Sequence, residues 1–201
     1  VSGPTVLMAV FNGLEFDGRV QRAASALAPV AEVHVLALSG SGDVWSPPDG
    51  AYTTEGVPGP MMGMGAQRAF ARRLRSVLSE RRPSMVYCHD YYLAMWIGAA
   101  RRAGAKVVYD AHELLIPERG ARRSPRDRFF TWAERTYASR ADLVICANEP
   151  RARLFQEYAG LRTLPTVVRN IPDEALEPAV EAVNRDVHRV LYQGDMSHGR
   201  R

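Results

Sequence analysis

Short apolar runs alternate with segments of helical spacing along most of this chain. Runs dominated by Val, Ile and Leu predict β-strands at residues 5–11, 32–38, 84–88, 106–110, 142–147 and 166–169. Apolar residues repeated every three or four positions predict helices at residues 19–27, 66–81, 93–103, 125–139 and 149–158. Apolar strands that alternate with helices indicate a parallel sheet covered on both faces. The sequence therefore predicts an α/β fold: a Rossmann-like, doubly wound, mainly parallel sheet with helices on both faces.

Two regions depart from this alternation. Residues 39–60 are rich in Gly, Pro and Ser and predict a loop with a short strand near Tyr52. Residues 187–193 predict a new strand, followed by a polar turn that opens at Gly194, and we expect the chain to end just as a second domain begins. The predicted domains are residues 1–175, a Rossmann-like domain, and residues 176–201, the hinge and first strand-turn of a truncated C-terminal domain.

Composition narrows the class of protein. The 201 residues are 46% hydrophobic, which is enough for the core of one domain and too few for two full Rossmann-like domains. No apolar run reaches about 18 residues, so no membrane span is predicted. The net charge of +4 comes from basic residues spread along the chain, and we infer no nucleic-acid partner from it. Cys88 and Cys146 lie in apolar runs without metal-ligand spacing, which predicts buried thiols and a cytoplasmic location.

Ligands of doubly wound sheets bind beyond the carboxyl ends of the strands, and the first such loop contains Asn12 and Gly13. A glycine there lets backbone amides approach a ligand phosphate at a helix N-terminus. The loop lacks the GxGxxG dinucleotide fingerprint, since only Gly13 and Gly18 are present, and this counts against an NAD site. The alternative is a plain strand-to-helix turn in which Asp17 caps the helix.

Three ionisable residues, Asp110, His112 and Glu113, lie within four positions where the strand at residues 106–110 ends. A histidine beside a carboxylate can be held in one tautomer and have its pKa adjusted, so this segment favours a functional role. The alternative is that Asp110 and Glu113 cap the next helix and His112 is packed. Further up the chain, His89 could bind a substrate hydroxyl or act as an acid or base, or it could hydrogen-bond Asp90 and only shape the loop.

A basic and aromatic stretch runs from Arg119 to Trp132. Cations beside large apolar side chains suit an anionic membrane surface, which would place the protein at the inner face of a membrane. The alternative, which we favour slightly, is a solvated helix start with its aromatic residues in the core.

Several common chemistries lack support in this sequence. It contains neither a GxSxG nucleophile elbow nor a P-loop, so the usual hydrolase and NTPase interpretations lose support. It has no Cys/His metal spacing, and we predict no metal site.

Several stretches, in this order, resemble glycosyltransferase family 4, whose members have the GT-B fold. The resemblance covers nearly the whole chain. It is carried by Asp17-Gly18-Arg19-Val20, Val86 to Asp90, Val108 to Leu114, Ala141 to Ala147, Val167 to Asp173, Leu191 to Gly194 and Gly199-Arg200.

The resemblance implies that the chain is one half of a GT-B fold. Its N-terminal domain would bind the acceptor, and a missing C-terminal domain would bind a nucleotide-diphosphate sugar as co-substrate. The sugar would be transferred with retention of configuration, without a metal or another cofactor. Acceptors in the family include glycans, lipids and small molecules, and the activity would be hexosyltransferase-like. We expect the 201-residue fragment alone to be inactive.

The resemblance also assigns roles to residues. It implies catalytic roles for His112 and Glu113, acceptor binding by His89, Asp90 and Asp110, and donor-phosphate binding by Asn12, Gly13 and Arg200. Two other hypotheses stay open: a sugar-nucleotide-modifying enzyme of another class, such as an epimerase, and a non-catalytic domain that binds glycan or membrane.

Overall fold

The computed structural model describes residues 3–115 and 124–171. The chain divides into two units, residues 1–170 and 171–201, and the described part is the first unit together with residue 171. The predicted domain boundary after residue 175, the predicted strand at residues 187–193 and the first part of the Arg119–Trp132 stretch lie outside the described residues. The division into residues 1–175 and 176–201 therefore stays a prediction.

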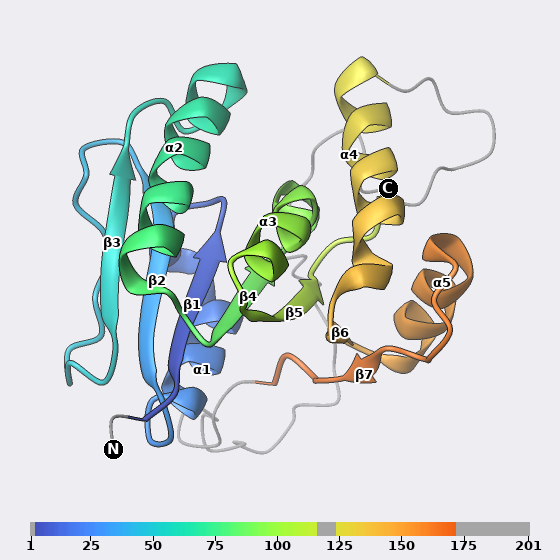
Figure 1. Ribbon diagram of the computed structural model, residues 1–201, viewed down its shortest axis with the longest axis horizontal. Coiled ribbons are helices and arrows are strands. Elements are labelled where there is room, and N and C mark those ends of the chain that lie inside the picture. Colours follow the sequence, from blue (N-terminus) through green and yellow to red (C-terminus); the bar gives the residue numbers. More distant parts are fainter. Residues whose placement is uncertain (1–2, 116–123, 172–201) are drawn as a thin grey trace, which may run out of the picture. The chain divides into compact units, whose positions relative to one another are not determined.

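A seven-stranded sheet forms the centre of the first unit (Figure 1). Every strand pairing is parallel, in the order β3-β2-β1-β4-β5-β6-β7. The strands are β1 (Thr5–Val10), β2 (Glu32–Ser39), β3 (Thr53–Pro58), β4 (Met85–His89), β5 (Lys106–Ala111), β6 (Leu143–Cys146) and β7 (Thr166–Val167). The chain order turns back between β1 and β4, which is the topological switch point where doubly wound sheets bind ligands.

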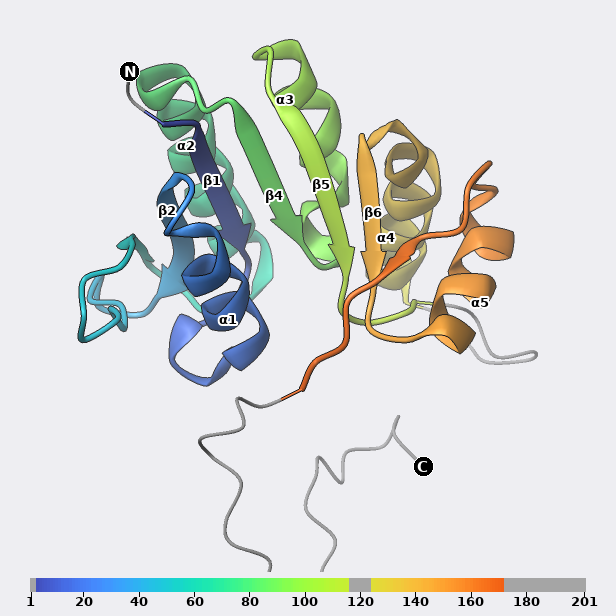
Figure 2. The same cartoon turned by 90° about the horizontal axis from the view of Figure 1, so that it is seen from below.

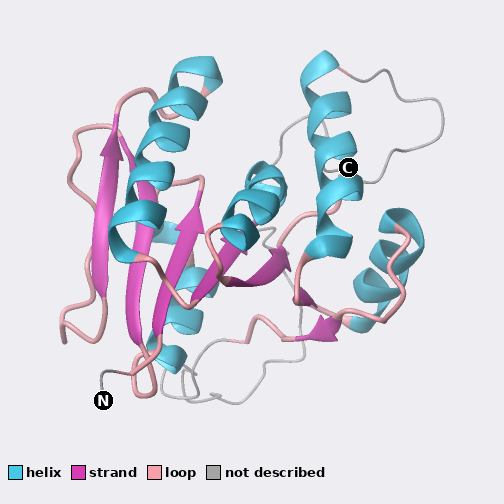
Figure 3. Ribbon diagram, viewed as in Figure 1, coloured by secondary structure: helices cyan, strands magenta, loops and turns pink. Residues whose placement is uncertain are grey.

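Helices cover both faces of the sheet (Figures 2 and 3). α1 packs on one face, and the remaining α-helices pack on the other, so the core has two apolar layers. The helical elements are η1 (Leu14–Phe16), α1 (Gly18–Leu27), α2 (Gly63–Arg81), η2 (Tyr91–Trp96), α3 (Ile97–Arg102), α4 (Pro125–Tyr137), η3 (Ala138–Arg140) and α5 (Glu149–Ala159). This arrangement confirms the predicted Rossmann-like, doubly wound fold.

Polar side chains satisfy the free backbone amides at three helix starts. Asp17 accepts a hydrogen bond from the Val20 amide at α1, as the sequence predicts. Ser124 and Asp127 form a capping box at α4, whose first residue is a proline. The Asn148 side chain accepts a hydrogen bond from the backbone amide of Arg151, the third residue of α5.

The loop-rich stretch contains a fuller strand than the sequence predicts. β3 occupies six residues and pairs with β2 from His34 to Ser39. Its Gly and Pro residues are typical of loops, yet Gly56 is required in this strand, because a Cβ atom there would clash with the carbonyl oxygen of Gly42. Elsewhere the predicted helix at residues 93–103 begins as the 3-10 helix η2, and the last predicted strand shrinks to the two residues of β7.

Two further expectations concern the cysteines and membrane-spanning helices. Cys88 and Cys146 are buried free thiols, as predicted. Among the described residues, no helix combines the length and apolarity that crossing a bilayer requires.

Candidate active site at the carboxyl edge of the sheet

The strand order brings the predicted site residues to one edge. β1, β4 and β5 are neighbours, and their register aligns Val10 with His89 and His89 with Asp110. Asn12 and Gly13 follow β1, while His112 follows β5, so the two loops leave the same edge with only β4 between their strands. The loops that the sequence predicts to form the site therefore lie together at the carboxyl edge of the sheet.

Asp110 is the centre of a buried polar network. Its side chain is 1% exposed, and the Arg19 guanidinium donates to both carboxylate oxygens, over 2.7 and 2.9 Å. A third nitrogen of Arg19 donates to the carbonyl oxygen of Val168 over 2.9 Å. Burial alone would raise the pKa of Asp110, but hydrogen bonds from His112 and Arg19 outweigh burial and lower that pKa to about 2. Asp110 is therefore a carboxylate at neutral pH.

Two histidines contact each other above this carboxylate. His89 Nδ1 lies 3.1 Å from His112 Nε2, and Asp110 Oδ2 lies 3.4 Å from the same atom of His112. Burial and the charge of His112 lower the pKa of His89 to about 3, so His89 is neutral. Burial also disfavours the charged form of His112, but the hydrogen bond and charge of Asp110 prevail, and the pKa of His112 is raised. The pair thus favours a neutral His89 that accepts a hydrogen bond from a protonated His112.

The two histidines differ in access. His89 is fully buried and its ring stacks on that of Tyr87, with centroids 4.4 Å apart. Its Nε2 atom has no hydrogen-bond partner among the described residues. The side chain of His112 is 15% exposed, so it is the member of the network that a ligand can reach.

Asp90 adopts a strained backbone conformation. Its φ of 69° and ψ of 165° lie in a region that residues other than glycine rarely occupy. Its carboxylate accepts a hydrogen bond from the Tyr91 amide over 2.8 Å. Burial raises the pKa of Asp90 to about 6. Strain of this kind concentrates at functional sites, because only the surrounding structure holds it in place.

The remaining predicted residues have no hydrogen bond to Asp110, His89 or His112 that the structure describes. The Asn12 amide donates to Asp17 over 2.8 Å, which ties the first loop to the start of α1. Gly13 has a φ of −72°, which any residue can adopt, and a Cβ atom there would meet only Met61, at 3.8 Å. Glu113 is exposed. Arg200 lies outside the described residues.

The geometry buries two of the residues predicted to bind an acceptor, His89 and Asp110. In the described domain both side chains are buried and contact His112, and neither faces solvent. The acceptor-binding and catalytic roles predicted for the site residues stay predictions.

His89, Asp110 and His112 could also hold a metal ion, because one ligand atom from each lies within 4.8 Å of the others. The carboxylate of Asp110 is already engaged by Arg19 through both oxygens. A cation added there would be repelled by the guanidinium, which favours the hydrogen-bonded network over a metal centre. The absence of a metal from the site stays a prediction.

Sequence reasoning missed three residues that shape the site. Arg19 and Tyr87 both contact Asp110, and Arg151 donates to the carbonyl oxygen of His112 over 2.6 Å. Arg19 is 91 residues from Asp110, and spacing carries no signal for such a contact. Tyr87 could have been found, because it precedes His89 by two positions on β4 and shares its face.

Comparison of the sequence with known families identifies the family of this chain. Residues 18–170 match the model of the glycosyl transferase 4-like domain, and the chain belongs to that family. No curated protein matches its sequence.

Solved glycosyltransferase structures share the fold. Sucrose-phosphate synthase of Thermosynechococcus elongatus superposes with a TM-score of 0.59 at 14% identity, over 82% of this chain and 47% of that one. UGT2 of Phytolacca americana, solved with UDP-2fluoro-glucose and pterostilbene, gives 0.60 at 9% identity, over 86% and 54%. UGT89C1 of Arabidopsis thaliana, solved with UDP-L-rhamnose, gives 0.52 at 16% identity, over 82% and 50%.

The described domain thus has the fold of one half of GT-B glycosyltransferases, in agreement with the resemblance seen in the sequence. The chain spans about half the length of these solved structures.

Proposed function

We propose that this chain is the acceptor-side domain of a retaining glycosyltransferase. The complete protein would move a sugar from a nucleotide-diphosphate sugar to an acceptor hydroxyl. The family match and the fold support transferase chemistry. The observation that carries the proposal is the contact between His112 and Asp110, which puts a partly exposed histidine with a raised pKa at the carboxyl edge of the sheet.

His112 is the proposed catalytic residue. Its raised pKa favours the protonated ring, which can stabilise the negative charge that develops on the leaving diphosphate. Asp110 fixes the ring through Nε2, so the ring carbon edge and Nδ1 are the parts left for a ligand. Positioned charge of this kind needs no reorganisation as the reaction proceeds.

Positioning roles follow from burial. Asp110 holds His112, Arg19 holds Asp110, and neutral His89 sets the distance between the two rings. Exposed Glu113 and strained Asp90 would orient the acceptor hydroxyl next to His112.

The first loop is proposed to receive the donor phosphates. The backbone at Gly13 does not require glycine, and the space around it is open apart from Met61. The close approach of a ligand to backbone amides would explain a glycine at this position. In the complete protein Arg200 would assist the leaving diphosphate, and no metal or other cofactor would be needed.

Release of nucleoside diphosphate tests this function. The complete protein is incubated with UDP-glucose and related nucleotide sugars, with and without a panel of glycan, lipid and small-molecule acceptors. We expect nucleoside diphosphate to appear only when a suitable acceptor is present, and the new glycosidic bond to keep the anomeric configuration of the donor. Conversion of the nucleotide sugar without an acceptor would favour an enzyme of another class, and binding without turnover would favour a non-catalytic domain.

A further inference from the structure

An apolar groove lies beside the candidate site, on the face of the sheet opposite α1. It runs between residues 63–75 of α2, the 3-10 helix η2 and the start of α4, with a volume of about 920 Å³. Figure 1 shows α2 and α4 standing on either side of α3, each with its N-terminal end beyond the carboxyl edge of the sheet. A concavity of this size is within the range of small-molecule sites.

The groove is lined by large apolar side chains, several of which are exposed to solvent. Met64 is 69% exposed and Phe129 is 43% exposed. Trp96 lies almost buried at the groove, with Met95 and Phe130 from the neighbouring elements. Exposed aromatic and methionine side chains that gather around one concavity mark a binding surface, because water contact with them is unfavourable.

Four arginines surround this apolar lining: Arg68, Arg72, Arg75 and Arg126. All four are exposed, no acidic side chain lines the groove, and none of the four has an ion pair among the described residues. Their neighbour Arg73 differs, because it pairs with Glu55 and Glu80 on the adjacent side of α2. Arg72 lies between the two sides, because it lines the groove and also borders the hollow that contains Glu55 and Arg73.

Two of the groove arginines are held over aromatic rings. Arg75 lies 5.0 Å from the ring centre of Trp96, and Arg126 lies 5.5 Å from that of Tyr92. Arg126 also donates a hydrogen bond to the Tyr92 hydroxyl over 2.8 Å. Cation–π contacts fix the positions of these guanidinium groups while leaving N–H donors for a ligand.

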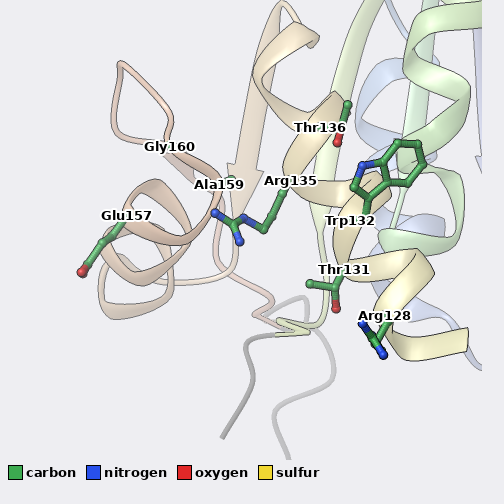
Figure 4. A pocket seen from close by; sticks show the side chains of 8 residues that line it. All are labelled: Arg128, Thr131, Trp132, Arg135, Thr136, Glu157, Ala159 and Gly160. Atoms are coloured by element: carbon green, nitrogen blue, oxygen red, sulfur yellow. The ribbon is translucent and has the colours of Figure 1, made fainter. Parts of the chain in front are cut away.

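A second hollow, between α4 and α5, differs from the groove in its lining (Figure 4). It has a volume of about 510 Å³ and is also lined by arginines. Its lining includes Glu157 and two threonines. Arg135 extends from α4 (Figure 4), and its guanidinium lies over the ring of Tyr158. The lining of this hollow is thus more polar than that of the groove.

From the unpaired arginines around an apolar concavity we infer a binding site for an anionic amphiphile. Its hydrocarbon chain would lie against Met64, Trp96 and Phe129, and its phosphate would be held by Arg68 and Arg72. Guanidinium groups bind phosphate through charge-assisted, bidentate hydrogen bonds. The inference concerns binding, and it holds whether or not the domain takes part in sugar transfer.

Trp96 provides the reporter for a direct test. In the 201-residue chain Trp45 and Trp132 are replaced by Phe, which leaves Trp96 as the single indole. Octyl phosphate, octyl glucoside and inorganic phosphate are titrated below the micelle concentration, and the emission of Trp96 is followed. We expect a saturable shift with octyl phosphate, an affinity for octyl glucoside at least about tenfold weaker, and no response to inorganic phosphate.

The charge requirement is tested by two matched double variants. Arg68→Gln/Arg72→Gln should weaken octyl phosphate binding at least about tenfold. Arg102→Gln/Arg162→Gln removes the same charge from exposed positions outside the groove and should leave binding unchanged. Near-ultraviolet circular dichroism checks that both variants keep the fold.

Three results would overturn the inference. Equal affinities for octyl phosphate and octyl glucoside would show that the arginines do not contribute to binding. Equal losses in the two double variants would show that net charge alone matters. A response to vesicles of phosphatidylcholine and phosphatidylglycerol, with none to monomeric octyl phosphate, would assign these residues to contact with a membrane surface instead of a site for one molecule.

Discussion

The guanidinium of Arg19 donates hydrogen bonds to both carboxylate oxygens of Asp110, over 2.7 and 2.9 Å. The two residues are 91 positions apart in the sequence. The contact joins the first turn of α1 to the end of β5, and the bond to the Val168 carbonyl extends it past β7. Because Asp110 in turn contacts His112, the orientation of the exposed histidine depends on a residue of the first helix. This relationship leads to the first prediction.

Replacing Arg19 should destabilise the domain. Arg19→Gln leaves the carboxylate of Asp110 buried without its cation, and removing one partner of a buried pair costs about 3 kcal/mol. Urea unfolding measures the loss. Arg153→Gln is the control, because it breaks an exposed ion pair with Glu149 and should cost no more than about 0.5 kcal/mol. Equal losses in the two variants would show that the Arg19 pair has no special role in the fold.

The two histidines should titrate far apart. Because Asp110 stabilises its charged form, His112 should show a pKa above 6.5, while buried His89 stays neutral down to a pH of about 3. Asp110→Asn removes the negative charge and should lower the pKa of His112. Ring nitrogen NMR spectra, assigned with single histidine variants, measure both values. A His112 pKa below 6.5, or one that Asp110→Asn leaves unchanged, would refute the proposed charge state.

Glu134 should make the stability of the domain depend on pH. It is fully buried on α4 and its Oε1 accepts a hydrogen bond from the Tyr109 hydroxyl over 2.5 Å, while its second oxygen has no partner among the described residues. Burial raises its pKa from 4.5 to about 8. The folded state therefore binds the proton more tightly than the unfolded state, and stability falls as the pH rises from 4.5 to about 8.

The slope in that interval should approach about 1.4 kcal/mol per pH unit for this one group. Glu134→Gln keeps the shape of the neutral side chain and should flatten the slope. Unfolding in urea at a series of pH values measures it for both proteins. A variant with an unchanged slope would show that Glu134 is ionised in the folded domain.

Gly13→Ala separates stability from ligand binding. The backbone of Gly13 suits alanine and the added methyl group meets only Met61, so the free energy of unfolding should stay the same or rise by up to about 1 kcal/mol. In the complete protein the methyl group should weaken binding of the nucleotide sugar, as calorimetry would show. Gly40→Ala is the control, since nothing lies within 4 Å of its added methyl group. Unchanged donor affinity in Gly13→Ala would remove the first loop from the phosphate site.

The sequence predicts the sheet well because apolar runs and caps are local signals. Asp17, Ser124 and Asn148 each lie where a helix begins, and continuous apolar strands such as β1 indicate burial on both faces. The strand predicted near Tyr52 is found as β3, but its six-residue length is underestimated because the Gly and Pro that it contains are typical of loops.

The site is predicted only in part for a related reason. The loops at the carboxyl edge follow from topology, since all strands are parallel. Arg19 and its contact with Asp110 depend on how α1 packs over β5, which no local pattern records. Glu134 was within reach of prediction, because it follows buried Phe130 by one helical turn and must share its face.

The central claim is that His112 acts on the sugar-transfer step, and one comparison tests it most directly. In the complete protein, turnover of nucleotide sugar with its acceptor is measured for His112→Gln and for His34→Gln, a buried histidine of β2 that pairs with Glu55 away from the site. The account predicts that His112→Gln lowers kcat by at least about 100-fold with little change in stability, whereas His34→Gln leaves kcat close to the wild-type value. Wild-type turnover in His112→Gln would contradict it.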